Sequence, residues 1–287
     1  MSLCILAAAV LSISHASHGV ADLKKKVLII GLDGVRPDAL LVAKAPNLLR
    51  LIEEGAFSDK AQTGEVPVSG PGWSSLLTGV WMEKHGVRDN SFNNKKYDRY
   101  PHFFKRVKEA MPDAMTASIS EWSPINEQIL SHSDYASTPG GGEEVAKAVV
   151  ELLVLQDPDA IFVHLDGADG AGHEYGYHPT IPEYVKSIED VDVLVGRILD
   201  AVRGRPTYEQ EDWLIIVSTD HGGKGTGHSA NDPEIRTIFI IAHGPSVING
   251  AIEPAPNIVD VAVTALAHLG IEAKPEWELD GKVVGIG

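Results

Sequence analysis

Aspartates and histidines follow three apolar runs of this 287-residue chain, VLIIGL, AIFVHL and WLIIVST. These residues are Asp33 after the first run; Asp166, Asp169 and His173 after the second; and Asp220, His221 and His228 after the third. Taken singly, an aspartate after a strand is most often a helix N-cap, and a loop histidine is usually solvated. Taken together, an Asp-x-x-x-His motif, an Asp-His pair and a third histidine indicate a site for a pair of divalent metal ions.

The elements that must position these residues are buried strands. Runs rich in Val, Ile and Leu without polar alternation are typical of strands covered on both faces, as in a parallel sheet. Ligand sites in such folds lie at the carboxyl ends of the strands, where all three groups of residues occur. The only cysteine is Cys4, so the metal ligands must be carboxylate, imidazole and hydroxyl groups.

Strand-like and helix-like segments alternate along the rest of the chain. The predicted strands are 27–32, 115–120, 160–165, 213–219 and 237–242, and the predicted helices are 46–55, 71–79, 101–110, 143–155, 181–203 and 258–269. This alternation predicts an α/β fold with a central, mostly parallel sheet flanked by helices on both faces. No internal repeat or low-complexity linker interrupts it, so we expect a single domain over residues 24–287.

Composition and the first residues limit the partners and the location. The net charge of −16 excludes a large nucleic-acid interface, which requires a basic face. The apolar stretch LCILAAAVLSI is too short to span a bilayer and is followed by small residues, so we expect an export signal over residues 1–16 and no transmembrane segment. The protein would then be periplasmic or secreted. Because no Lys or Arg precedes the stretch, the alternative is an apolar tail or misplaced start on a cytoplasmic protein.

Several motifs in one order resemble a known family. They are LDGVRPD, APNLLRLIEEGAF, SGPGWSSLLTGVWMEKHGV, DGADGAGHEYG, STDHGG and GHSANDPEIRTIFIIAHGP, and the resemblance extends over residues 26–285. The pattern is similar to the alkaline phosphatase superfamily and, within it, to the type I phosphodiesterase and nucleotide pyrophosphatase family. The resemblance implies an alkaline phosphatase-like fold and two metal sites. One would be formed by Asp33, Ser69, Asp220 and His221, and the other by Asp169, His173 and His228.

The implied chemistry is phosphoryl transfer. Two ions about 4 Å apart stabilise both the attacking and the leaving oxygen of a displacement at phosphorus. Carboxylate and imidazole ligands favour Zn²⁺, with Mn²⁺ or Mg²⁺ possible where oxygen dominates. Ser69 is the candidate nucleophile because it lies just ahead of a helix predicted to begin at Pro71, whose N–H groups could face a phosphoryl oxygen. Thr63 is a weaker candidate.

The chain departs from the family pattern around this serine. The family commonly has threonine at the nucleophile position and asparagine three residues later, whereas this chain has Ser69 and Gly72. An amide that could bind a phosphate oxygen is therefore missing at that position. Asp89 and Asn90 resemble a family motif and are further candidate substrate contacts. A sulfatase is disfavoured because its signature requires arginine where Trp73 stands.

The sequence therefore predicts a two-metal hydrolase of small phosphoric esters that works through a covalent seryl intermediate. Nearby cationic residues are few, namely Arg36, Lys84, Arg88 and Lys224. We expect a preference for phosphodiester or nucleotide pyrophosphate bonds, because a monoester dianion needs more positive charge. The alternatives are a phosphomonoesterase, a sulfatase and a metal-binding protein without turnover. The sequence does not predict the oligomeric state.

Overall fold

A computed structural model describes residues 23–287, and the predicted export signal at residues 1–16 lies outside them. Eight strands form one sheet in the order β4-β3-β5-β1-β6-β7-β2-β8. The strands are β1 Lys24–Leu32, β2 Ala56–Gln62, β3 Thr116–Ser120, β4 Tyr135–Ser137, β5 Ala160–Leu165, β6 Glu211–Ser218, β7 Thr237–His243 and β8 Gly250–Ala251. Neighbouring strands are parallel except where β7 pairs with β6 and β2, so the predicted mostly parallel sheet is confirmed.

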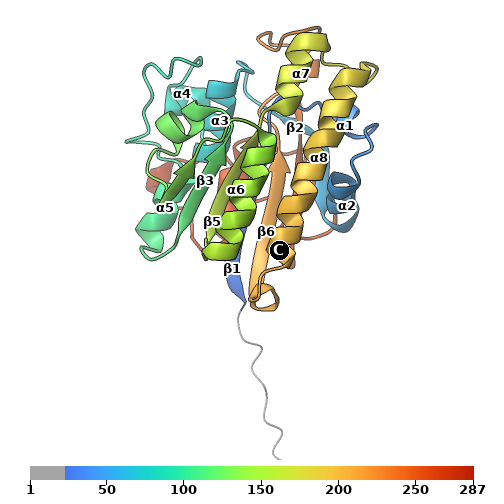
Figure 1. The fold of residues 1–287 in the computed structure, drawn as a ribbon. Coiled ribbons are helices and arrows are strands. Elements are labelled where there is room, and N and C mark those ends of the chain that lie inside the picture. The colour runs from blue at the N-terminus through green and yellow to red at the C-terminus, as the bar shows by residue number, and fades with distance from the viewer. Residues whose placement is uncertain (1–22) are drawn as a thin grey trace, which may run out of the picture.

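Helices cover both faces of the sheet, as predicted, and Figure 1 views the face covered by α6 and α8. One face carries α1 Pro37–Leu40, α2 Pro46–Glu54, α6 Gly142–Leu155, α7 Gly167–Tyr175 and α8 Pro182–Arg203. The other face carries α3 Ser69–Thr78, α5 Phe103–Ala110 and α10 Asp260–His268. Short helical segments are α4 Met82–His85, a π-helix Ile125–Ile129, the 3₁₀ turns Tyr208–Gln210 and Pro275–Trp277, and α9 Pro233–Arg236. Within residues 23–287, none of the helices has the length and apolar character needed to cross a bilayer.

The central strand β1 explains why the candidate residues meet. Its side chains alternate between the two cores, with Leu28 and Ile30 in one and Val27 and Ile29 in the other. It lies between β5 and β6 in parallel register, so all three strands end at one edge of the sheet. Asp33 and the residues that follow β5 and β6 therefore emerge side by side.

The predicted segments match observed elements, with one boundary that matters for the site. The helix predicted to begin at Pro71 begins at Ser69, because the Gly72 N–H bonds the carbonyl of Val68 and closes the first turn two residues earlier. A proline in the first turn is tolerated because its missing N–H would have no partner there. Ser69 is thus part of the helix rather than of the loop before it.

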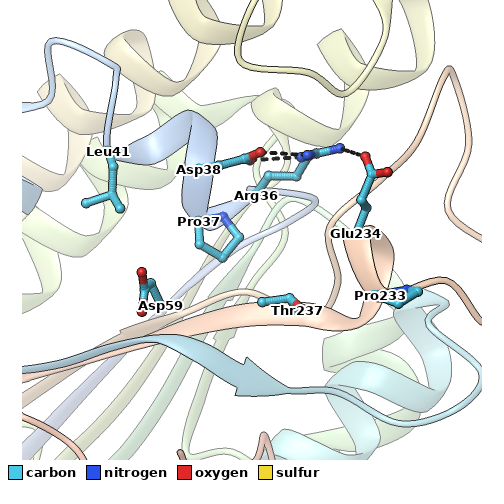
Figure 2. A pocket seen from close by; sticks show the side chains of 8 residues that line it. All are labelled: Arg36, Pro37, Asp38, Leu41, Asp59, Pro233, Glu234 and Thr237. Atoms are coloured by element: carbon cyan, nitrogen blue, oxygen red, sulfur yellow. Dashed lines mark hydrogen bonds and ion pairs between the residues drawn. The ribbon is translucent and has the colours of Figure 1, made fainter.

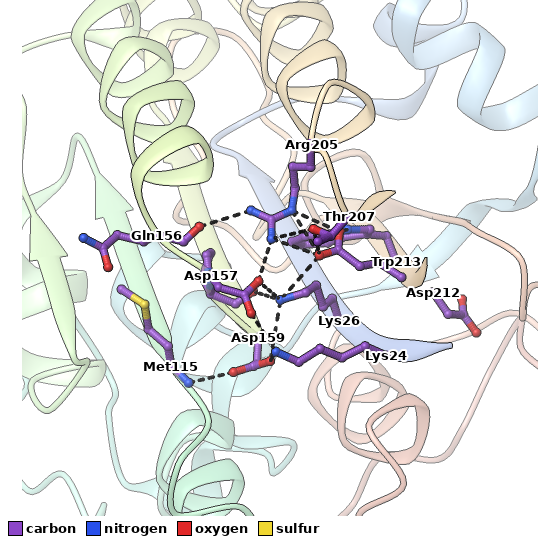
Figure 3. A network of polar contacts seen from close by, with 12 residues as sticks. Lys24, Lys26, Met115, Gln156, Asp157, Asp159, Arg205, Thr207, Asp212 and Trp213 are labelled. Atoms are coloured by element: carbon purple, nitrogen blue, oxygen red, sulfur yellow. Dashed lines mark hydrogen bonds and ion pairs between the residues drawn. The ribbon is translucent and has the colours of Figure 1, made fainter. Parts of the chain in front are cut away.

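A network of charged residues joins the strands at the opposite end of the sheet (Figure 3). Lys26 of β1 is fully buried, and its Nζ donates to Asp157 at 2.7 Å and to the carbonyl of Pro158 at 2.8 Å. Arg205 donates to Glu211 of β6, and Glu211 also accepts the indole N–H of Trp213 at 2.7 Å. Each buried charge has a partner, as burial of an ion requires. This network connects the amino ends of β1 and β6 far from the metal-ligand candidates.

Candidate metal centre

The carboxyl edge of the sheet brings two groups of possible metal ligands together. Asp33, Asp220 and His221 offer ligand atoms that all lie within 4.8 Å of one another. Asp169, His221 and His228 form a second such group, so His221 lies between the two. Five of the seven ligand residues predicted from the sequence are therefore gathered in two overlapping clusters, and His173 lies beside the second of them.

Asp33 presents one oxygen to the cluster and uses the other for hydrogen bonds. Its Oδ2 accepts the indole N–H of Trp73 at 3.0 Å and lies 3.0 Å from Nε2 of His164. Its Oδ1 is buried without a hydrogen-bond partner and lies 3.5 Å from Nε2 of His221. A buried carboxylate oxygen without a partner is costly, unless a cation occupies the space in front of it.

Asp220 and His221 have the same unsatisfied character. Both carboxylate oxygens of Asp220 and Nε2 of His221 are buried without a hydrogen-bond partner. Nδ1 of His221 lies 2.9 Å from the carbonyl of Gly222, which can only accept, so Nδ1 carries the proton of the neutral ring. The lone pair of Nε2 therefore faces the Asp220 carboxylate 3.2 Å away. Lone pairs of this kind, oriented by a backbone carbonyl, are suited to a metal ion.

The electrostatics of the first cluster also favour a cation beside its carboxylates. Burial, together with the nearby charges of Asp33 and Asp169, raises the pKa of Asp220 well above its ordinary value. Burial alone would raise the pKa of Asp33 as well, but the His164 hydrogen bond and the neighbouring imidazoles hold it below its ordinary value. Burial lowers the pKa of His221 to about 3, so this ring is neutral. Buried carboxylates around a neutral imidazole fit a divalent cation.

Beside the second cluster, the imidazole of His173 faces the imidazole of His228. Nδ1 of His173 lies 3.0 Å from the carbonyl of Thr226, and Nδ1 of His228 lies 3.0 Å from the carbonyl of Pro67. In the neutral rings both Nδ1 atoms are thus the donors, and both Nε2 atoms carry lone pairs. The two Nε2 atoms lie 3.2 Å apart, and that of His173 lies 3.4 Å from Asp169 Oδ2. A cation between them removes the repulsion of the two lone pairs.

Ser69 begins α3, the helix that packs against Asp220 of the first cluster through Gly72. The side chains of residues three apart on a helix share a face, and Gly72 lies against Asp220: a Cβ at Gly72 would come within 2.9 Å of the Asp220 Cβ. Ser69 is itself 8% exposed, so solvent or a small ligand can still reach it. The weaker candidate Thr63 is fully buried, which leaves it inaccessible to a substrate.

Position 72 has no side-chain amide, but Asn90 brings one to the same helix turn. Gly72 cannot carry a side chain without displacing Asp220, but Asn90 brings an amide to the same helix from a distant loop. Its Oδ1 accepts the N–H of Gly70 at 2.7 Å, which places the amide beside the residue after Ser69. The sequence indicated Asn90 only as a possible substrate contact, because twenty positions separate it from Gly70.

Three of the four nearby cations are already paired with carboxylates. Arg36 is 5% exposed and lies between Asp38 and Glu234 (Figure 2). Lys84 lies 2.5 Å from Asp280, and Lys224 lies 3.0 Å from Glu234. The remaining candidate, Arg88, is an exposed residue two positions before Asn90.

The cavity beside Arg36, of about 320 Å³, is lined by none of the predicted metal ligands. It is lined by Arg36, Pro37, Asp38, Leu41, Asp59, Pro233, Glu234 and Thr237.

Asp166, which is not among the seven predicted ligands, lies near Asp33 and His164. Burial and the charge of Asp33 raise the pKa of Asp166 to about 7.

The sequence matches a known family over most of its length. The family model described as type I phosphodiesterase / nucleotide pyrophosphatase matches residues 27–132 and 106–239. Bis(5'-adenosyl)-triphosphatase ENPP4 of Homo sapiens is 26% identical over 229 residues, which cover 72% of this chain and 49% of that protein. An uncharacterized pyrophosphatase/phosphodiesterase of Schizosaccharomyces pombe is 24% identical over 231 residues, covering 72% and 46%. The chain spans about half the length of these curated relatives.

Solved structures share the fold. Murine ectonucleotide pyrophosphatase / phosphodiesterase 5 superposes with a TM-score of 0.71 at 17% identity, covering 87% of this chain and 96% of that one. A 2-O GAG sulfatase superposes with a TM-score of 0.73 at 14% identity, covering 91% and 73%. An inactive variant of the murine protein is in complex with AMP, with a TM-score of 0.67, 16% identity and coverage of 88% and 96%. At these identities the likeness establishes the fold alone, which is alkaline phosphatase-like as the sequence predicted.

Proposed function

Since the chain belongs to the type I phosphodiesterase / nucleotide pyrophosphatase family, we propose that it is a two-metal-dependent hydrolase of phosphodiester or nucleotide pyrophosphate bonds. The observation that carries the proposal is the set of buried lone pairs without partners at the carboxyl edge of the sheet. They come from the carboxylates of Asp33 and Asp220 and from the imidazole of His221. Beside them, the Nε2 atoms of His173 and His228 face each other 3.2 Å apart, at the second group of candidate ligands. Such a donor set fits two divalent ions, with Zn²⁺ favoured by the imidazoles.

Each ion would have its own ligands, and Ser69 would be one of the ligands of the first ion. Asp33, Ser69, Asp220 and His221 would hold one ion, and Asp169, His173 and His228 the other. Bound there, the ions would supply Lewis-acid stabilisation of the attacking and leaving oxygens. In the first turn of α3 the Gly70 N–H donates to Asn90, Pro71 has no N–H, and the Gly72 N–H bonds Val68, so the Ser69 N–H would be the backbone donor for a phosphoryl oxygen. The Asn90 amide lies at the same turn and would be a second donor.

The serine would act as a nucleophile. Ser69 Oγ forms a bond to phosphorus as it loses its proton, and the bond from phosphorus to the leaving oxygen breaks. The leaving oxygen takes up a proton, which completes release of the first product. Water then attacks the phosphoseryl group from the opposite side, the Oγ–P bond breaks, and Ser69 regains its proton. No atom of the enzyme is consumed in the cycle.

The charge around the site supports a diester substrate. A diester carries one negative charge on its phosphoryl group, whereas a monoester can carry two. Because Arg36, Lys84 and Lys224 are paired with carboxylates, little free positive charge remains for a dianion. The relatives named as triphosphatase and pyrophosphatase, and the neighbour in complex with AMP, support a nucleotide as one half of the substrate.

A comparison of two aryl esters tests the proposal. The protein is stripped of metal, reconstituted with Zn²⁺, Mn²⁺ or Mg²⁺, and assayed on bis-aryl and mono-aryl phosphates of the same phenol. We expect metal-dependent turnover and a higher kcat/KM for the diester, because this ratio measures transition-state discrimination. A monoester advantage of about 100-fold, or about 2.7 kcal/mol, would make the protein a phosphomonoesterase instead. Binding of two ions without turnover of either ester would make it a metal-binding protein.

A further inference from the structure

Two buried aromatic side chains each donate a hydrogen bond to a carboxylate of one candidate metal site. The indole of Trp73 donates to Asp33, and the phenol of Tyr177 donates to Asp169. We propose that Trp73 and Tyr177 are positioning residues that decide which oxygen of each carboxylate faces its ion. The inference rests on the proposed metal centre, and it concerns residues that would not themselves touch the ions or the substrate.

The position of Trp73 is fixed from several sides. Its side chain is fully buried, and it packs edge-on against Phe162 and His164, with ring centroids 5.8 Å and 5.1 Å away. Gly31 of β1 leaves the space that the indole fills, since a Cβ there would come within 2.5 Å of the ring. A side chain enclosed in this way has one orientation, so its N–H points at one place.

This fixed donor selects one oxygen of Asp33. Oδ2 accepts from Trp73 and faces Nε2 of His164, both at 3.0 Å, and these two contacts occupy it. Oδ1 is left without a partner and faces the cluster that contains His221. An indole N–H can only donate, so Trp73 cannot compete with Asp33 for a cation. The carboxylate is thereby presented to an ion through a single oxygen.

Trp73 also connects the ligand to the nucleophile. It lies on α3 four residues after Ser69, one turn further along the same helix. The hydrogen bond from Trp73 therefore ties the helix that carries Ser69 to the end of the strand that carries Asp33. Any shift of α3 along its axis moves Ser69 and strains the Asp33 contact together.

Tyr177 has the equivalent arrangement at the second site. Its hydroxyl donates to Asp169 Oδ1 at 2.5 Å, which leaves Oδ2 toward His173. Its ring lies between Gly172 of α7 and Gly223 of the loop after β6, because a Cβ at either glycine would come within 2.2 Å of it. A phenol is neutral at ordinary pH and carries one proton, which this geometry directs at the Asp169 carboxylate.

Substitution of each aromatic residue by phenylalanine removes the donor and keeps a ring. Apo protein is titrated with Zn²⁺ against a chromophoric chelator, and Asp220→Asn and His173→Gln identify which binding step belongs to which site. We expect Trp73→Phe to weaken binding at the Asp33 site about 10-fold or more, and Tyr177→Phe to do so at the Asp169 site. The other site of each variant should stay within about twofold of the wild-type value.

Trp213→Phe is the matched control, because Trp213 is also a buried indole that donates to a carboxylate, at the opposite end of the sheet (Figure 3). It should leave both Zn²⁺ affinities unchanged. The melting temperature of each apo variant separates positioning from folding, since a residue with only a packing role would lower it and leave the Zn²⁺ affinities intact.

Three outcomes would count against these assignments in different ways. Unchanged affinities in Trp73→Phe and Tyr177→Phe, or equal losses in Trp213→Phe, would overturn the positioning role. Wild-type protein that binds no Zn²⁺ would overturn the metal centre as well. Wild-type protein that binds two ions and hydrolyses neither aryl ester would overturn the proposed function and leave the positioning role standing.

Discussion

At the scale of single residues, the site separates groups that would bind metal from groups that would act on the substrate. Asp33, Asp220 and His221 have buried acceptor atoms without partners that lie close together, which fits ligands of one ion. Ser69 would both bind the first ion and attack phosphorus, whereas Asn90, at the same first turn of α3, would act on the substrate alone. Substitutions should therefore affect metal binding and turnover differently.

Replacement of the nucleophile should abolish turnover and spare the second ion. We expect Ser69→Ala to lower kcat below about 1/1,000 of the wild-type value, since no other group would form the covalent intermediate. The ion at Asp169, His173 and His228 should stay bound, as elemental analysis would show. Ser75→Ala is the control, because Ser75 lies on the same helix and bonds His85 rather than the site. A near-normal rate in Ser69→Ala would mean that water attacks phosphorus directly.

The amide of Asn90 should matter for the transition state. We expect Asn90→Ala to lower kcat/KM for the diester about 10- to 100-fold, because one donor to a developing phosphoryl charge is lost. Asn90→Asp should lower it further, since a carboxylate repels the substrate. Zn²⁺ affinity should not change in Asn90→Ala. If kcat/KM stays within twofold of the wild-type value, the amide serves only to cap α3 through Gly70.

At the scale of elements, close packing of α3 against the loop after β6 sets the position of the first cluster. Gly72→Ala should destabilise the protein by about 1–3 kcal/mol, because the added Cβ would come within 2.9 Å of the Asp220 Cβ. The Zn²⁺ affinity of that site should fall as well. Gly170→Ala is the matched change in α7, where nothing lies within 4 Å of the added Cβ, and it should stabilise the protein by about 0.5–1 kcal/mol. Urea denaturation measures the free energy of unfolding of both variants. If Gly72→Ala is as stable as the wild type, α3 is not tightly packed against Asp220 at Gly72.

The central strands were predictable because their sequences are continuous apolar runs, as expected for strands buried on both faces. The strands 27–32 and 160–165 are continuous apolar runs, and both are found in the sheet. The strand Ala56–Gln62 was not predicted, since its sequence AFSDKAQ lies at the less buried side of the sheet and includes polar residues. Helix α7 was missed because GADGAGHEY has three glycines and no apolar stripe.

The candidate ligand residues could be selected from the sequence, whereas the residues that surround them could not. Local motifs indicated Asp169 and His173, which are one turn apart on a helix. Contacts between distant segments have no local signal. Trp73, His164 and Tyr177 reach the ligands only through tertiary packing, and Asn90 reaches α3 from a separate loop.

At the scale of the whole molecule, buried neutral histidines should make the apo protein sensitive to acid. Burial lowers the pKa of His85 to about 4 and that of His102 to about 3, against about 6.5 in an unfolded chain. Between the folded pKa values and pH 6.5, the histidines of the unfolded state bind protons that those of the folded state do not. The stability that these two histidines contribute is therefore fully present above pH 6.5 and is lost as the pH falls below it. Each group contributes a slope of up to about 1.4 kcal/mol per pH unit.

Urea denaturation of the apo protein at pH 7 and pH 5 measures this effect. The difference between wild type and His85→Asn isolates one group, because the carboxylates titrate in both. We expect His85→Asn to lose less stability between the two pH values than the wild type. The exposed His178 provides the control, since His178→Asn should keep the wild-type slope. Equal slopes in wild type and His85→Asn would show that His85 is not held neutral by burial.

The place of β1 in the sheet also sets when this protein can fold during its synthesis. Val27 pairs with Ala160 on one side and with Leu214 on the other, so the first strand made waits for partners that leave the ribosome much later. A nascent chain that ends before β6 lacks Asp220, His221 and His228 and has no complete metal centre. Until then the apolar run VLIIGL is an unpaired strand that can associate with other chains. We therefore expect arrested translation products to need a chaperone, and added metal ions cannot replace it.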